Sequence, residues 1–202
     1  MDVVITILLA IMSYLYGSVP FALVVGKLFY NTDVRESGSG NLGGTNAGRV
    51  LGKKVGLIVI LLDISKCCLS IFITRCLAHY FGITTDIIYL SALCCVVGHC
   101  YPIFAGFRGG KAVSVAIGYA FMTNIYAGII AVVVFLLTLK ISKYVSLSSI
   151  LASLAILFIS PFIGYSTIGI CTNALIVALL IFKHRTNIIR IFNDTESKIT
   201  WM

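Results

Sequence analysis

The 202-residue chain has few charged residues, and their scarcity excludes a water-soluble globule. Only 11% of its residues are charged, against 59% that are hydrophobic, and its mean hydropathy is +1.06. A soluble domain of this size needs more polar surface to face water. The composition therefore predicts an integral membrane protein.

The sequence also lacks the alternation of apolar and polar residues that is typical of membrane β-strands, so the predicted class is all-α. Apolar runs such as Val3 to Gly26 and Val55 to Arg75 are long enough to cross about 30 Å of hydrocarbon as helices. The first run follows Asp2 instead of a basic segment and shows no cleavage pattern, so we expect it to be retained as a spanning helix.

Internal repeats and low-complexity linkers are absent from the sequence as well, and no polar stretch is long enough to fold alone. Residues 1–202 are therefore predicted to form one polytopic membrane domain. Trp201 is expected to act as an interfacial anchor.

Basic residues decide the expected topology after Lys111. The stretch from Ala112 to Leu139 is too long for one span and short for two. If the chain turns at Asn124 and again between Pro161 and Gly164, every lysine and arginine except Lys66 and Arg75 falls on one side, which the positive-inside rule makes cytoplasmic. We predict seven transmembrane helices, some short, with the N-terminus outside and the C-terminus cytoplasmic.

A five-helix alternative treats Ala112 to Leu139 as one tilted span. That arrangement would place Lys140 and Lys143 outside, against the positive-inside rule.

Three polar strings interrupt the apolar sequence, and all three fall on the predicted cytoplasmic side, where they could converge on one site. The first runs from Ser37 to Arg49 and is predicted to be a loop that binds an anion, the alternative being a flexible linker. Its expected ligand-binding groups are the backbone beside Gly38, Gly40, Gly43, Gly44 and Gly48, the neutral side chains of Ser39, Asn41, Thr45 and Asn46, and the guanidinium of Arg49.

The second string runs from Gly98 to Lys111. Gly109, Gly110 and Lys111 come just before the next predicted helix, where free amides and a lysine favour an anion. The string does not match the nucleotide-binding P-loop, because Ala105 and Ala112 stand at two required positions. His99 lies near Cys94, Cys95 and Cys100, but without metal-ligand spacing, so inert buried thiols are expected.

The third string, from Lys183 to Glu196, is basic and allows two interpretations, a site or a lipid anchor. His184 and Asn187 are three residues apart, so they can share a helix face, which favours a site. Asp63 and Lys66 have the same spacing inside a predicted span, where an ion pair is either functional or holds helices together.

Together these features resemble one family, the bacterial acyl-phosphate:glycerol-3-phosphate acyltransferases. The matching pieces are Gly17 to Pro20, Asp33 to Arg49, Asp63 with Lys66, Gly98 to Lys111, Lys143 to Ser149 and Lys183 to Arg190. The sequence departs from the family pattern at Cys67, Ala112 and Asp194, where glycine is usual, and at Arg108, where lysine is usual.

The resemblance implies transfer of a fatty acyl group from acyl phosphate to the 1-hydroxyl of glycerol 3-phosphate, giving lysophosphatidic acid and inorganic phosphate at the cytoplasmic face of a bacterial plasma membrane. By the same resemblance, the catalytic residues are Ser39, Arg49, Lys111, His184 and Asn187, with a phosphate-binding role. The expected substrate-binding residues are Gly40, Asn41, Thr45, Asn46, Lys66, His99, Gly109, Gly110, Ser149 and Arg185.

The expected partners are the two substrates and the lipid bilayer, with no cofactor, no metal and no nucleic acid. Either a substrate phosphate or a histidine, His99 or His184, could act as the general base. The His and Asp pair of soluble-type glycerolipid acyltransferases is absent, because Thr84, Phe104 and Ile189 stand five residues after the three histidines. An organic-anion transporter and a structural subunit are the alternative classes, but for a transporter the predicted bilayer midplane offers few polar groups besides Asp63 and Lys66.

Overall fold

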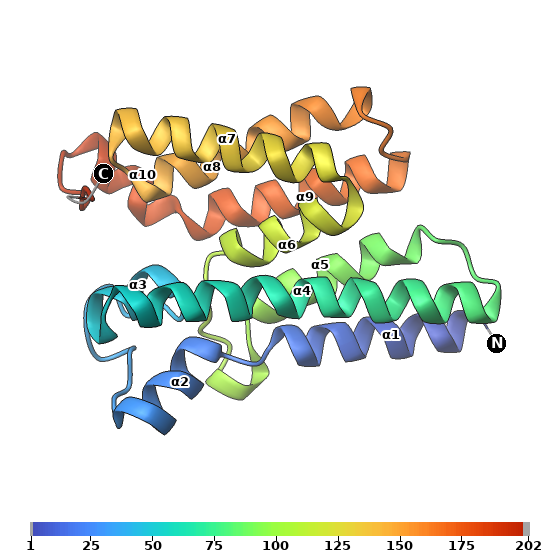
Figure 1. The fold of residues 1–202 in the computed structure, drawn as a ribbon, viewed down its shortest axis with the longest axis horizontal. Helices are drawn as coiled ribbons and strands as arrows, with labels where there is room; N and C mark the ends of the chain where they lie inside the picture. The colour runs from blue at the N-terminus through green and yellow to red at the C-terminus, as the bar shows by residue number, and fades with distance from the viewer. Residues whose placement is uncertain (1, 200–202) are drawn as a thin grey trace. The chain divides into compact units, whose positions relative to one another are not determined.

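The computed structural model describes residues 2–199, and across these residues the regular structure is entirely helical. Packing divides the chain into two compact units, one ending at Tyr119 and the other beginning at Ala120 (Figure 1). The single domain stays a prediction. Trp201 lies outside the described residues.

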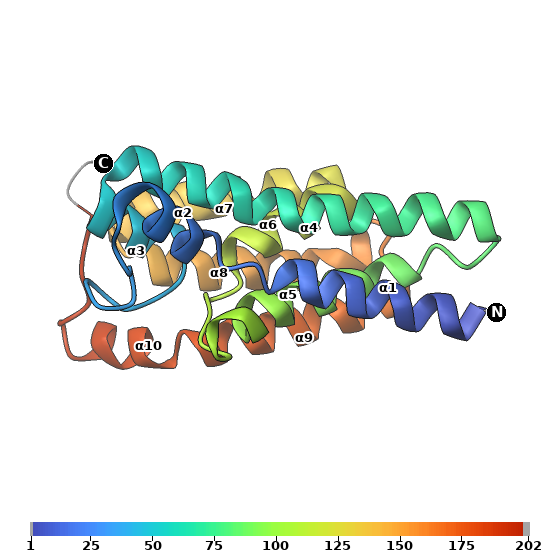
Figure 2. The ribbon, with the colours of Figure 1, turned by 90° about the horizontal axis from the view of Figure 1, so that it is seen from below.

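The first unit is built on three long helices, α1 (Asp2–Gly17), α4 (Lys53–Phe81) and α5 (Ile87–Cys100), which lie side by side in both views (Figures 1 and 2). Glycines allow α1 and α5 to approach closely, since a Cβ on Gly17 would overlap the backbone of Cys95. Ser91 of α5 is hydrogen-bonded to Ser13 of α1 (2.6 Å) and accepts a hydrogen bond from Thr74 of α4 (2.9 Å). These hydroxyls join all three helices inside the apolar interior.

The predicted first span is two helices, because α1 ends at Gly17 and α2 (Phe21–Tyr30) follows at an angle of 42°. Pro20 lies in the break and has no backbone N–H to continue the helix. The Nζ atom of Lys66 donates to the carbonyl of Val19 at 3.0 Å. The Val19 carbonyl also accepts a hydrogen bond from the Phe21 amide at 3.1 Å, so the buried cation of α4 adds a second hydrogen bond at the break.

The first polar string is only partly a loop, which corrects the prediction. Residues 44–51 form helix α3 (Gly44–Leu51), which packs on α4. Gly48 faces Gly56 of α4, and a Cβ on Gly44 or Gly56 would collide with the opposite backbone or side chain. Gly44 and Gly48 therefore serve close helix packing, while Gly38 and Gly40 have the positive φ angles, +64° and +67°.

Helix α6 (Val113–Thr123) and helix α7 (Ile125–Ser142) are separated by the predicted turn at Asn124. The Asn124 side chain accepts hydrogen bonds from the amides of Tyr126 and Ala127 and donates to the carbonyl of Ile163. The ring of Phe121 occupies the space where Gly128 would carry a Cβ, a contact that a continuous helix would not allow. The stretch is therefore two helices and not the single span of the five-helix alternative.

The second unit continues with α8 (Val145–Ile159), the short helix η2 (Ser160–Phe162), α9 (Thr167–Lys183) and α10 (Arg185–Phe192). Helix α8 packs against α7, α9 and α10. The predicted turn between Pro161 and Gly164 is confirmed, with Gly164 at a φ of +85°.

Four helical segments among the described residues are long and apolar enough to cross a membrane, namely Lys53–Phe81, Ile87–Ala105, Ile125–Ser142 and Val145–Phe162. The count rises to six if each bent pair, α1 with α2 and α9 with α10, is one span, while α6 is a shorter apolar helix. The chain is thus a multi-pass membrane protein by length and composition.

Candidate active site

Asn46 holds the loop between α2 and α3 in place. It is 1% exposed and its side chain makes four hydrogen bonds. Its Nδ2 group donates to the carbonyls of Val34 (2.7 Å) and Ser37 (3.3 Å), while its Oδ1 atom accepts from the amide (2.7 Å) and the hydroxyl (3.1 Å) of Ser39. We call Asn46 and the three residues that it contacts, Val34, Ser37 and Ser39, the loop anchor. Asn46, predicted to be a free donor, is instead fully used within the fold.

Three other predicted residues of this string face outward. Ser39 and Thr45 are exposed, and so is Arg49 in the last turn of α3. The Oδ1 atom of Asn41 is buried and accepts no hydrogen bond from the described part of the chain. The surface of this string therefore presents the hydroxyls of Ser37, Ser39 and Thr45 and the guanidinium of Arg49.

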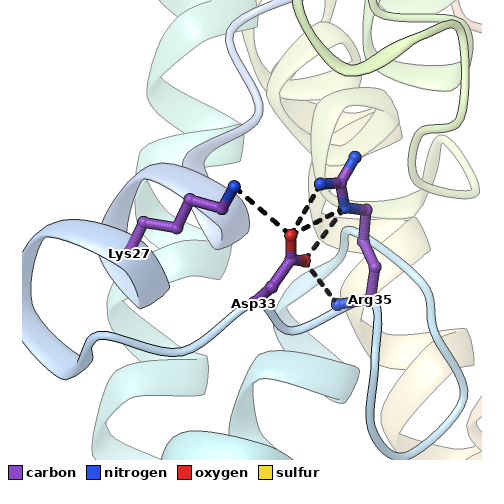
Figure 3. A network of polar contacts seen from close by, with 3 residues as sticks. All are labelled: Lys27, Asp33 and Arg35. Carbon is purple, nitrogen blue, oxygen red and sulfur yellow. Dashed lines mark hydrogen bonds and ion pairs between the residues drawn. The ribbon is translucent and has the colours of Figure 1, made fainter.

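An ion cluster fixes the start of the same loop (Figure 3). The Asp33 carboxylate accepts from the Arg35 side chain at 2.6 and 2.9 Å, and the Lys27 Nζ atom lies 3.4 Å away. The hydrogen bond from Arg35 holds the pKa of Asp33 well below its ordinary value, against the raising effect of burial, and the same bond raises the pKa of Arg35. This cluster keeps Asp33 ionised and ties the loop to the end of α2.

The second string forms a turn against His99. The amide of Gly110 donates to the His99 carbonyl at 3.0 Å, and the imidazole ring fills the space where Gly110 would carry a Cβ. Gly109 likewise lies against the His99 carbonyl and the Pro102 ring. The Gly110 amide is therefore not free for an anion, contrary to the prediction, whereas Lys111 is half-buried just before α6 as expected.

A buried polar cluster of Asp63, Lys66 and His99 lies next to this turn. The predicted ion pair is confirmed, with Lys66 Nζ 3.0 Å from Asp63 Oδ1 and both side chains 1% exposed. The Nδ1 atom of His99 lies 3.6 Å from the same oxygen. Because His99 contacts both Asp63 and Gly110, the cluster connects the interior of α4 to the turn that carries Lys111.

Two departures from the family pattern fall where the backbone favours glycine. Ala112 has a φ of +70° and is fully buried, and Asp194 has a φ of +54°. Both angles lie in the left-handed region, where a Cβ is strained. Cys67, the third departure, is buried within the regular helix α4.

The third string is a bend followed by a helix, and not the frayed end of α9. Helices α9 and α10 meet at His184 at an angle of 55°. His184 is 3% exposed, and its Nδ1 atom is 2.8 Å from the carbonyl of Leu180. A carbonyl can only accept, so Nδ1 carries the proton, and Nε2 of a neutral ring carries the lone pair.

Glu196 accepts hydrogen bonds from three side chains, and we call these four residues the C-terminal clamp. Its carboxylate accepts from Ser146 (2.8 Å), Asn187 (2.7 Å) and Arg190 (2.8 Å). Burial alone would raise the pKa of Glu196, but these hydrogen bonds lower it below its ordinary value of 4.5. The clamp fixes the side chain of Asn187, one of the predicted catalytic residues.

Two predicted residues stay outside this clamp. Arg185 is exposed, with its guanidinium over the ring of Phe182 and donating to the Phe182 carbonyl. Ser149 is buried and donates to the carbonyl of Val145 one turn earlier. Ser146, Arg190 and Glu196 were not predicted as site residues, although Ser146 and Arg190 lie inside matched motifs.

No group of three or more histidine, cysteine, aspartate or glutamate side chains suited to a metal occurs within residues 2–199. The chemistry that these four clusters and the basic residues beside them offer is hydrogen bonding and charge.

Comparison with known proteins agrees with the sequence motifs. A family model described as glycerol-3-phosphate acyltransferase matches residues 7–194. The chain belongs to this family. Among curated members, the glycerol-3-phosphate acyltransferase of Listeria welshimeri is 46% identical over 200 residues, covering 97% of this chain and 98% of the relative. Glycerol-3-phosphate acyltransferase 2 of Bacillus anthracis is 46% identical over 193 residues, covering 96% and 98%.

Solved members of the glycerol-3-phosphate acyltransferase family share the fold. Two crystal structures of PlsY, an integral membrane glycerol 3-phosphate acyltransferase, superpose with TM-scores of 0.89 for the glycerol 3-phosphate form and 0.87 for the lysophosphatidic acid form. Their sequences are 36% and 35% identical to this chain; each match covers 96% of this chain, and 96% and 95% of the respective PlsY chains. The predicted resemblance and the membrane class are therefore confirmed.

Proposed function

We propose that this chain transfers a fatty acyl group from an acyl phosphate to the 1-hydroxyl of glycerol 3-phosphate, giving lysophosphatidic acid and inorganic phosphate. The supporting observation is the family match along nearly the whole chain, together with the likeness to PlsY crystallised in glycerol 3-phosphate and lysophosphatidic acid forms. Transfer of this kind would commit a fatty acid to phospholipid synthesis.

The reaction needs alignment and charge neutralisation more than covalent catalysis. The hydroxyl oxygen forms a bond to the acyl carbon, the bond from that carbon to the phosphate oxygen breaks, and the hydroxyl proton leaves with the phosphate. Acyl phosphates are already activated, so no covalent acyl-enzyme intermediate is required. Negative charge develops on the departing phosphate, where fixed cations stabilise the transition state most.

Residue roles follow from the clusters. Arg49 is exposed on α3 and Lys111 precedes α6, so each can contact a substrate phosphate. His184 carries its proton on Nδ1, so Nε2 of a neutral ring is an acceptor, and we assign His184 to substrate contact or to the role of general base. Asn187 is held by Glu196, and we assign it to substrate contact.

Lys66, His99 and Asn46, three further predicted site residues, support these contacts. Lys66 pairs with Asp63, and Asp63 lies near His99, which packs against Gly109 and Gly110 beside Lys111. Asn46 accepts a hydrogen bond from Ser39. Seven spans, an outside N-terminus and a cytoplasmic active face of a bacterial plasma membrane complete the proposal, supported by the distribution of basic residues. Labelling a cysteine at position 143 tests the topology, and accessibility only from outside would refute it.

The decisive assay is release of inorganic phosphate from palmitoyl phosphate by purified protein, with and without glycerol 3-phosphate. We expect release that needs both substrates and that Lys111→Ala abolishes. Lys140→Ala, an exposed lysine at the end of α7, is the matched control and should retain full turnover. Folded protein that shows no turnover, but exchanges labelled glycerol phosphate across proteoliposomes, would make the chain a transporter.

A further inference from the structure

Helices α4 and α5 run antiparallel and meet along a seam of polar side chains (Figures 1 and 2). Asp63 of α4 faces His99 of α5 at 3.6 Å. Further along the seam, Thr74 of α4 donates to Ser91 of α5 at 2.9 Å. Between these two contacts each helix carries a buried cysteine, so the register of the seam brings the two cysteines together.

The two cysteines are Cys67, one turn after Asp63 on α4, and Cys95, one turn before His99 on α5. Their thiols are hydrogen-bonded to each other, and both residues are 0% exposed. The register of the helices and the contact between the thiols agree. The structure therefore places the two sulfur atoms side by side in the apolar interior.

Other cysteines of the chain have different surroundings. The Sγ atom of Cys68 lies 3.8 Å from the Gly118 carbonyl of α6, and Cys76 and Cys171 are exposed. Glycine is the usual residue of the family at position 67, where this chain has a cysteine. A chain that follows the family pattern therefore lacks the thiol pair.

We propose that Cys67 and Cys95 form an oxidation site, at which a hydroperoxide dissolved in the bilayer joins the two thiols as a disulfide between α4 and α5, and that this disulfide slows acyl transfer. The site replaces the expectation that the Cys95 thiol is inert. An uncharged oxidant is required, because charged reagents do not enter the apolar interior. The slowing of acyl transfer rests on the proposed function, whereas the disulfide itself does not.

The reaction consumes one hydroperoxide for each disulfide. The sulfur of one cysteine attacks the terminal peroxide oxygen, the O–O bond breaks, and the departing alkoxide takes the thiol proton and leaves as an alcohol. The second sulfur then attacks the resulting sulfenic acid, whose S–O bond breaks, and the hydroxide takes the second thiol proton and leaves as water. Because the second thiol is already in contact, this condensation is intramolecular and favoured over further oxidation.

The disulfide acts on the candidate active site through the neighbouring layer of the seam. Bonded sulfur atoms lie closer together than hydrogen-bonded ones, so α4 and α5 must shift toward each other at this layer. One turn away, His99 lies 3.6 Å from Asp63. The same imidazole ring fills the space beside Gly110, next to Lys111. A shift of His99 therefore moves the turn that carries Lys111.

The test uses the full chain in proteoliposomes, with the exposed Cys76 and Cys171 replaced by serine so that separate molecules are not joined. This parent protein is treated with cumene hydroperoxide, and its remaining thiols are alkylated after denaturation. Mass spectrometry without reduction identifies linked peptides, and the phosphate-release assay measures turnover before and after oxidation.

Two variants of the parent protein remove the thiol on α4. Cys67→Gly carries the usual residue of the family, and Cys67→Ala retains helix propensity if glycine destabilises α4. Cys68→Ala, at the next position of the same helix, is the matched control because its thiol contacts a carbonyl of α6 instead.

We expect a linkage between Cys67 and Cys95 in the parent protein and in Cys68→Ala, together with a fall in turnover of about tenfold, because small displacements in an active site are costly. Cys67→Gly and Cys67→Ala should turn over before oxidation and retain that turnover after it.

Absence of the linkage from folded, oxidised parent protein would overturn the oxidation site. A linked protein with full turnover, or an equal loss of turnover in Cys67→Gly and Cys67→Ala, would overturn the coupling to acyl transfer. A failure of the proposed function is distinct from both outcomes, because turnover would then be absent before oxidation, while mass spectrometry would still report the linkage.

Discussion

The loop anchor and the C-terminal clamp hold polar segments by different chemistry. In the loop anchor, a neutral amide that is 1% exposed ties residues 34–39 together through four hydrogen bonds. In the clamp, the charged Glu196 draws in three donors, one of them from Arg190, whose side chain is 43% exposed. A neutral anchor is insensitive to pH and salt, whereas a charged one gains strength from ionisation and depends on it.

Asn46→Ala should give the largest effect. The substitution removes four hydrogen bonds at a buried position, so we expect a loss of about 2–4 kcal/mol in the free energy of unfolding. The Ser39 hydroxyl would lose its fixed position, and kcat/KM should fall by about 100-fold. Thermal unfolding and turnover measure both. A variant with wild-type turnover would show that the loop needs no anchor, and Ser37→Ala serves as the control.

Glu196→Gln should come next. Glutamine keeps an oxygen for Ser146 and Asn187, but loses the charge that attracts Arg190, so we expect a cost of about 1–2 kcal/mol. Because Asn187 is then held less firmly, kcat/KM should fall about tenfold. Steady-state kinetics and thermal unfolding test this.

Arg190→Gln is the matched variant for the charge, and it should cost less than about 1 kcal/mol because its guanidinium is partly exposed. If Arg190→Gln were as damaging as Glu196→Gln, the ion pair itself, and not the hold on Asn187, would be the main contribution of the clamp.

Lowering the pH should weaken the C-terminal clamp but not the loop anchor. The pKa of Glu196 lies below its ordinary value of 4.5, so the clamp contributes its full stabilisation above that pH and loses it as the pH falls through the lowered folded-state pKa. Asn46 does not titrate. Hydrogen exchange, corrected for intrinsic pH dependence, should show faster exchange for residues 193–199 on acidification, while residues 37–46 keep their protection. Simultaneous loss in both segments would indicate general acid unfolding.

The difference between local and long-range contacts explains which features of the fold and the site the sequence could predict. The spacing of Asp63 and Lys66 predicts a pair, and the structure has it at 3.0 Å, because helix geometry alone brings such residues together. The turn at Asn124 is a local feature of the same kind. By contrast, Ser146 and Glu196 are 50 residues apart, and no local periodicity joins them.

Helix α3 was missed for a different reason. Its glycines disfavour a helix in isolation, but Gly44 and Gly48 let α3 lie directly on α4, and tertiary packing overrides the propensity. The contact of Asn46 with Ser39 was missed because the residue types alone do not show which backbone and side-chain groups a buried amide binds.

Ala112 provides the smallest expected effect, since opposing contributions nearly cancel. Its φ of +70° is strained for alanine by about 1 kcal/mol, which Ala112→Gly would relieve. The same change removes a fully buried methyl group worth about 0.8 kcal/mol and adds freedom to the unfolded chain. We expect a net change in unfolding free energy of less than about 1 kcal/mol and a change in KM for glycerol 3-phosphate of less than about threefold.

Ala112→Val should lower the free energy of unfolding by about 2 kcal/mol or more. A β-branched side chain is strained at a φ of +70°, and the fully buried position has no room for two more methyl groups. Thermal unfolding of the two variants side by side measures the balance. If Ala112→Gly instead lowered KM several-fold at unchanged stability, the alanine methyl would be holding the Lys111 turn away from its phosphate. The departure from glycine at this position would then act on substrate affinity and not on folding.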